Sequence, residues 1–82
     1  EWSAAHSFFS EALQFKPGYA SALRRRAEIE QLIYHNPNAA AADYRVALRF
    51  TSAPRAQAAL LTRLGQNFRT LQLADSAQAV LR

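Results

Sequence analysis

The chain has 82 residues, of which half are hydrophobic and a fifth are charged, and it carries a net charge of +4 at pH 7. A chain this short forms one small domain with a thin core, which excludes a two-domain enzyme. It contains no cysteine, so disulfides, thiol chemistry and a cysteine-based zinc site are excluded.

Few glycines and prolines together with abundant alanine and arginine make the composition that of a helical protein, and we expect an all-α fold. No apolar run approaches the ~20 residues that cross a bilayer, so no membrane span is expected. The chain begins at Glu1 rather than at methionine, and we expect it to be an excerpt or a processed product.

The first predicted helix covers residues 2–15, where Trp2 and Phe9 lie on one apolar face at helical spacing. Pro17 and Gly18 follow it directly. Proline cannot continue a helix and glycine tolerates the left-handed turn that often follows one, so the helix is expected to end here.

Helical periodicity next predicts a second helix over residues 19–34 and a third over residues 37–51. Asn36 followed by Pro37 has the form of an N-cap and a first-turn proline. His35 is therefore expected in the turn between these two helices.

The last part of the chain predicts a fourth helix over residues 54–71 and a fifth over residues 75–81, joined by a short connection at residues 72–74. Ser52 and Pro54 repeat the cap-and-proline pattern before the fourth helix. Five helical segments with short joints predict an antiparallel up-and-down arrangement.

An internal repeat of small and large apolar residues runs along the chain. Its copies are Ala5 with Phe9, Ala40 with Tyr44, and Ala77 with Leu81, and in the alternate helices Leu23 with Ala27 and Leu61 with Gly65. Two helices approach closely only where neither carries bulk, so small residues should lie at the helix contacts. The small residues expected there are Ala27, Ala40, Ala47, Gly65 and Ala77. A repeat of about 35 residues predicts stacked helical hairpins.

This pattern resembles the tetratricopeptide repeat (TPR) family, whose motif runs W-x2-L-G-x2-Y, then A-x3-F, then P. The best match is made by Leu61, Leu64, Gly65, Phe68, Ala77 and Leu81. The resemblance implies a short α-solenoid. Its units would be residues 1–17 as the second helix of one repeat, residues 18–53 as a complete repeat and residues 54–82 as an incomplete repeat.

The resemblance also implies a protein–protein interaction scaffold that binds a peptide or partner segment in the groove lined by the first helix of each hairpin. The groove residues it implies are Ser21, Arg24, Glu28 and Leu32 from the second helix and Ala59, Thr62, Gln66, Arg69 and Thr70 from the fourth. Arg24 and Arg69 each offer a two-pronged hydrogen bond to a carboxylate, so a partner with acidic groups is expected.

The sequence departs from the family pattern at Arg26 and Glu30, where the family usually has apolar residues. These two residues are four positions apart, and we expect them to pair with each other on one helix face.

The two ends of such an array are expected to be partly bare, because helical repeats bury their faces only against neighbours. The apolar residues concerned are Trp2, Phe8 and Phe9 at one end and Val80 and Leu81 at the other. The chain should therefore belong to a longer array or associate with copies of itself through its uncapped ends.

No catalytic, metal or cofactor site is expected. His6 and His35 are the only histidines and fall in different elements, no serine lies in a G-x-S-x-G context, and no glycine-rich phosphate loop occurs.

Two alternative functions remain open. The first is a basic helical module that binds nucleic acid, favoured by the isoelectric point near 10.4. The arrangement of Arg24, Arg25 and Arg26 argues against this function. On a helix these side chains point in directions about 100° apart, so they form no basic stripe on one face. The second is a structural or dimerisation segment of a larger protein.

Overall fold

The computed structural model describes residues 1–81, with side chains described for residues 1–73. Its elements are α1 (Trp2–Phe15), α2 (Ala20–Leu32), α3 (Pro37–Arg49) and α4 (Pro54–Leu81). No strand occurs within residues 1–81, so the predicted all-α class is confirmed. None of the described helices combines the length and apolarity that a membrane span requires.

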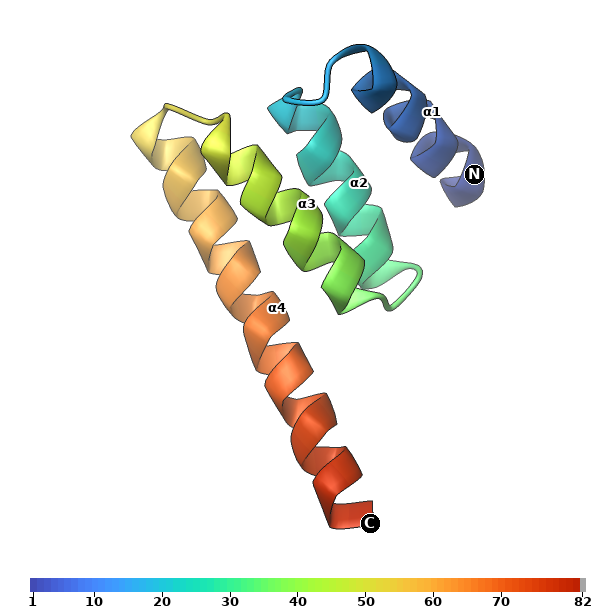
Figure 1. Ribbon diagram of the computed structural model, residues 1–82, viewed down its shortest axis with the longest axis vertical. Coiled ribbons are helices and arrows are strands. Elements are labelled where there is room, and N and C mark those ends of the chain that lie inside the picture. Colours follow the sequence, from blue (N-terminus) through green and yellow to red (C-terminus); the bar gives the residue numbers. More distant parts are fainter. Residues whose placement is uncertain (82) are drawn as a thin grey trace.

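The four helices lie side by side in chain order, with α1 and α4 at opposite edges of the molecule (Figure 1). Each helix packs mainly against its neighbours in the chain, and the most extensive contact is between α2 and α3. The C-terminal half of α4 projects beyond the other three helices (Figure 1). The molecule is therefore an elongated row of 44 × 31 × 17 Å and not a closed bundle.

The first helix has the predicted bounds, and the second and third are two or three residues shorter than predicted. The helix α1 ends at Phe15, before Pro17, as expected. Gly18 does not adopt the left-handed conformation that glycine tolerates. Its lack of a side chain matters for packing instead, because a Cβ at Gly18 would lie 2.8 Å from the ring of Phe50.

The predicted cap of α3 is confirmed. The side chain of Asn36 accepts a hydrogen bond of 3.3 Å from the backbone N–H of Ala39, and Pro37 occupies the first turn. His35 lies in the preceding turn, as predicted, with a left-handed φ of 52°. The turn and the cap together reverse the chain between α2 and α3.

The prediction of separate fourth and fifth helices is wrong, since α4 is one helix of 28 residues. The physical reason lies in the proposed connection, residues 72–74. Gln72, Leu73 and Ala74 favour helix, and no glycine or proline stands near them to end it. The described fold has four helices rather than five.

The core is built around small residues, as the repeat predicted. Ala27 on α2 and both Ala40 and Ala47 on α3 are completely buried. They share one buried cluster with Leu23 and Tyr44. Alanine at these positions allows the two helix backbones to come close, while the tyrosine ring fills the space beside them.

The same expectation is wrong for Gly65. It is exposed, and a Cβ placed there would meet no atom within 4 Å. The large residues beside it are also exposed, Leu61 by 55% and Phe68 by 44%, although the Arg45 guanidinium lies over the Phe68 ring. The reason is that α4 continues as one helix to Leu81, so within residues 1–81 no following helix covers this face. Ala77 and Leu81 lie outside the residues whose side chains are described.

Candidate interaction surfaces

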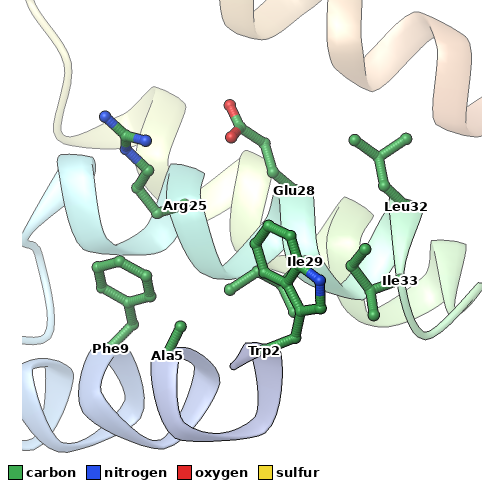
Figure 2. A pocket seen from close by; sticks show the side chains of 8 residues that line it. All are labelled: Trp2, Ala5, Phe9, Arg25, Glu28, Ile29, Leu32 and Ile33. Atoms are coloured by element: carbon green, nitrogen blue, oxygen red, sulfur yellow. The ribbon is translucent and has the colours of Figure 1, made fainter.

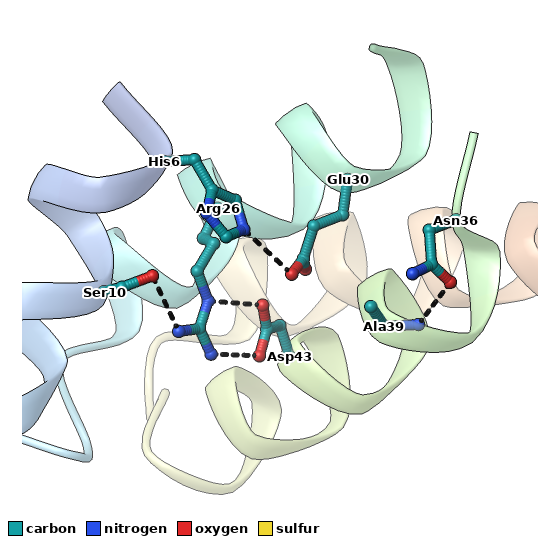
Figure 3. A network of polar contacts seen from close by, with 7 residues as sticks. All are labelled: His6, Ser10, Arg26, Glu30, Asn36, Ala39 and Asp43. Carbon is teal, nitrogen blue, oxygen red and sulfur yellow. Dashed lines mark hydrogen bonds and ion pairs between the residues drawn. The ribbon is translucent and has the colours of Figure 1, made fainter. Parts of the chain in front are cut away.

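A network of polar side chains ties α1, α2 and α3 together (Figure 3). The Nε and Nη2 atoms of Arg26 donate to the two carboxylate oxygens of Asp43 at 2.8 and 2.7 Å. The third nitrogen, Nη1, donates to the hydroxyl of Ser10 at 3.3 Å. The donor Arg26 and the acceptor Asp43 attract each other strongly because Asp43 is buried.

Glu30 is a buried carboxyl group at the same junction. Its Oε2 lies 3.2 Å from Nε2 of His6, whereas its Oε1 is buried without a hydrogen-bond partner. Burial raises the pKa of Glu30 to about 8, the nearby Asp43 adds to the increase, and Arg26 opposes it. The group is therefore neutral at pH 7.

The expected pair between Arg26 and Glu30 is wrong. Each side chain instead reaches a neighbouring helix, Arg26 to Asp43 on α3 and Glu30 to His6 on α1. Within residues 1–73 no three side chains of the metal-ligating types converge. The network holds α1, α2 and α3 together through Arg26 and Glu30, which stand where the TPR pattern usually has apolar residues.

An apolar hollow of about 310 Å³ lies between α1 and α2 (Figure 2). Its walls are Trp2, Ala5 and Phe9 from α1, Ile29 and Leu32 from α2 and Ile33 directly after α2, with Arg25 and Glu28 at the rim. Figure 2 shows that the charged ends of the two rim residues point away from α1. The hollow therefore has an apolar floor and a charged edge, which suits an amphipathic segment.

A second hollow of about 260 Å³ opens where the start of α2 meets the loop between α3 and α4. Ser21 and Arg24 line it from α2, and Thr51 and Ser52 line it from the loop. The Nε atom of Arg24 is buried and has no hydrogen-bond partner among the described residues. We call this site the Arg24 hollow.

The facing sides of α2 and α4 carry polar groups around the ring of Tyr44. Glu28 on α2 and Arg63 on α4 form a loose ion pair of 3.7 Å. Burial raises the pKa of Tyr44, and the nearby Arg63 opposes that shift. The side-chain nitrogen of Asn67 and the side-chain oxygen of Gln31 are buried without partners.

The sequence analysis missed Asn67, which is almost completely buried. Its spacing was the available signal, because it lies seven residues after Leu60 and three after Leu64 on the buried face of α4. A polar residue on an apolar face marks a helix contact that also requires hydrogen bonding.

The four groove residues predicted on α2 all line hollows. Ser21 and Arg24 line the Arg24 hollow, while Glu28 and Leu32 line the hollow between α1 and α2. The residues predicted on α4 are all exposed and line neither hollow: Ala59, Thr62, Gln66, Arg69 and Thr70. The structure thus divides the predicted α2 residues between two hollows and places none of the predicted α4 residues in either.

The residues predicted at the ends of the array lie as follows. Trp2 and Phe8 are 57% and 66% exposed, and Phe9 is half-buried. Val80 and Leu81 lie outside the residues whose side chains are described. Their expected role at an interface stays a prediction.

The three consecutive arginines point to different surroundings. Arg24 lines the second hollow, Arg25 stands at the rim of the first, and Arg26 is held by Asp43. These three residues therefore form no continuous basic stripe along α2.

Comparison with protein-family models, with curated proteins and with solved structures found no match to this chain.

Proposed function

We propose that this chain is a protein–protein interaction scaffold of the TPR type, which binds an acidic segment of a partner protein at the N-terminal half of α2. Two features support the TPR type. Complete burial of Ala27, Ala40 and Ala47 reproduces the spacing of small residues between successive antiparallel helices. The helices also follow one another in a row, as they do in stacked hairpins.

Two observations on Arg24 carry the binding site: its side chain lines a hollow of about 260 Å³, and its Nε is buried without a hydrogen-bond partner among the described residues. A buried donor without an acceptor costs about 1–3 kcal/mol. A carboxylate that enters the hollow relieves this cost through two parallel hydrogen bonds with the guanidinium. Ser21 on the same wall supplies a hydroxyl for a further polar contact.

The charge of the chain favours the same kind of partner. A net charge of +4 raises the local concentration of acidic segments and speeds their association. An extended acidic peptide therefore satisfies both the local hydrogen-bonding requirement of Arg24 and the charge of the whole molecule.

A peptide-display selection against the 82-residue chain tests this proposal. We expect the selected peptides to share an aspartate, a glutamate or a free C-terminal carboxylate. Arg24→Lys should weaken their binding about 10-fold or more, because lysine keeps the charge but loses the two-pronged geometry. Lys16→Ala, which removes one positive charge outside both hollows, should change binding much less.

Two results would overturn the proposal. One is a set of selected peptides whose binding is the same to the native chain and to Arg24→Lys. The other is nanomolar binding of a random-sequence single-stranded DNA that collapses steeply as salt is added, which would assign the positive charge to nucleic acid instead.

A further inference from the structure

Two apolar helix faces of this molecule are bare. The first, which we call the head face, belongs to α1 and consists of Trp2, Ala5, Phe8 and Phe9. The second, the tail face, belongs to α4 and consists of Leu61, Gly65 and Phe68, where the Arg45 guanidinium lies over the Phe68 ring at 5.1 Å from its centroid. Every residue of both faces is exposed or only half-buried. Bare apolar faces of this kind mark interaction sites.

The internal repeat shows what kind of helix would cover the tail face. Residues of α4 correspond to residues of α2 that lie 38 positions earlier, so Leu61 and Gly65 correspond to Leu23 and Ala27. In α2 these two positions are buried with α3. The tail face therefore has the pattern that α2 uses to bind the helix that follows it.

The buried face of α4 supports this correspondence. Leu60 and Asn67, which are buried in α4, correspond to Ala22 and Ile29, which are buried in α2. Ala22 and Ile29 line hollows with residues of α1, the helix before α2. Both helices thus use one face for the preceding helix, and only α2 has its other face covered.

The head face has the complementary pattern. Ala5 and Phe9 of α1 correspond to Ala40 and Tyr44 of α3, which lie 35 positions later. Ala40 is completely buried and Tyr44 is 2% exposed, and both share a buried cluster with Leu23 and Ala27 of α2. The same two positions in α1 are only half-buried. The head face therefore has the pattern that α3 uses to bind the helix that precedes it.

We infer that the tail face of one copy binds the head face of a second copy, so that α4 and α1 of two molecules form the same kind of helix pair that α2 and α3 form within one molecule. The occupant of each bare face is thus a second copy of this chain, and the hollow between α1 and α2 receives α4 of the neighbouring molecule.

The side chains at corresponding positions of the two faces are also compatible in chemical type. Within one molecule the buried acid Asp43 on α3 lies beside Glu30 on α2. The corresponding residues between molecules are Phe8 on the head face and Phe68 on the tail face. Polar residues meet polar residues inside the molecule, and aromatic residues meet aromatic residues between molecules, where such pairs stabilise contacts.

The rim of the hollow supplies a further match. Within one molecule Glu28 of α2 pairs with Arg63 of α4. The corresponding residues between molecules are Gln66 on α4 and Arg25 of the second copy. Both side chains are exposed, and Arg25 makes no ion pair among the described residues. The amide oxygen of Gln66 is an acceptor for the Arg25 guanidinium.

A contact between two different faces leaves one head face and one tail face free on every assembly. Heterologous contacts of this kind form open chains of copies unless the rotation closes a ring. The mass of the assembly is therefore expected to rise continuously with protein concentration and not to stop at a dimer.

Gly65 gives the sharpest test, because its substitution affects the isolated chain and the proposed contact differently. In the single molecule a Cβ at this position meets open space, and leucine or alanine favours helix over glycine by up to about 1 kcal/mol. In the proposed contact the position is as crowded as Ala27, which has no exposed surface. Alanine fits there and leucine does not.

The experiment is light scattering with size-exclusion chromatography over roughly a hundredfold range of concentration, over which a micromolar complex assembles. We expect the native chain and Gly65→Ala to increase in mass with concentration. Gly65→Leu should stay at the single-chain mass of 9.2 kDa while keeping its helical circular dichroism. Phe8→Asp, which places a charge on the head face, should also stay monomeric.

Mixing the two monomeric variants identifies the faces. Gly65→Leu keeps an intact head face and Phe8→Asp keeps an intact tail face, so one contact remains possible between them. The mixture should form a 1:1 dimer that does not grow further. A charged partner for Arg25 should strengthen the contact, so Gln66→Glu should assemble at a lower protein concentration than the native chain. This difference between the variant and the native chain should become smaller at high salt.

Three results would overturn the inference: a native chain that stays monomeric throughout, a Gly65→Leu variant that assembles like the native chain, or a mixture that stays monomeric. The outcome is separate from that of peptide binding, because the head and tail faces do not include Arg24. Either proposal can fail while the other holds.

Discussion

Arg26 on α2 grips Asp43 on α3 through two parallel N–H···O bonds of 2.8 and 2.7 Å. Asp43 is 7% exposed, so its charge depends on this one guanidinium for compensation. Removal of either partner leaves the other charge in a poorly hydrated place. The pair is therefore costly to break even where its net contribution to stability is small.

Arg26→Ala and Asp43→Ala should each lower the free energy of unfolding by about 2–4 kcal/mol. The double variant should lose much less than the sum, because no unpaired charge remains. Urea denaturation followed by circular dichroism at fixed protein concentration measures these values. Arg49→Ala, at an exposed position, should change stability by about 0.5 kcal/mol or less. Additive losses at Arg26 and Asp43 would contradict the observed pairing.

The stability of the chain should depend on pH through Glu30. Its pKa is raised from 4.5 to about 8, mainly by burial, so between these values the folded chain holds a proton that the unfolded chain has released. This stabilisation is fully present below pH 4.5 and is lost as the pH rises through 8. The groups that face Glu30 are His6, Arg26 and Asp43.

Urea midpoints measured from pH 6 to pH 9 check this dependence. The native chain should become less stable from pH 6 to about pH 8, and the loss should level off above that pH. Glu30→Gln, which stays neutral, should show a flatter profile and should exceed the native chain in stability at pH 9. Parallel profiles for the two chains would show that Glu30 does not carry the effect.

We expect the stability of the fold to require glycine at position 18 only because the ring of Phe50 lies close to it. A Cβ at Gly18 would lie 2.8 Å from the aromatic ring, so Gly18→Ala should cost about 1 kcal/mol as the ring is pushed aside. In a Phe50→Ala background the same substitution should cost nothing, since glycine has no left-handed φ to maintain here. A double-mutant cycle with thermal unfolding gives the coupling energy. An equal cost in both backgrounds would attribute the effect to the backbone of the turn.

The helix boundaries that sequence predicts correctly are those with strong local chemistry. Pro17 ends α1, and Asn36 with Pro37 begins α3, because a cap or a missing N–H acts within a few residues. The predicted break at residues 72–74 had no such local cause. Without a breaker, the intrinsic helix preference of that segment prevails.

The polar network was only partly predictable. Sequence identifies Arg26 and Glu30 as charged residues on an otherwise apolar face, and their four-residue spacing predicts a pair within α2. Tertiary packing decides otherwise, because His6 and Asp43 come from distant positions and offer partners at 3.2 Å or less. Sequence alone therefore does not show whether Arg26 and Glu30 pair locally or with distant residues, because the answer depends on how α1, α2 and α3 pack together.

Gly65 illustrates the same limit for the site. Its place in the repeat assigns Gly65 to the position of Ala27, but does not say whether a helix covers that position. Whether a helix covers the face of α4 that carries Gly65 depends on the direction of the chain beyond residue 71. The small residues of the repeat do not determine that direction. The exposed state of Gly65 is consequently known only from the structure.

The most direct test of this account is the distance between spin labels on α4, because the tail face is available to a second copy only if α4 runs straight. Ala58→Cys and Val80→Cys introduce two labelling sites in a chain that has no other cysteine. Electron–electron resonance on labelled chain diluted with unlabelled chain should give about 33 Å between the two backbone positions, as 22 residues of helix require. A distance below about 20 Å would mean that the chain folds back on α4 and covers the tail face itself, which would contradict both the continuous helix and the head-to-tail contact.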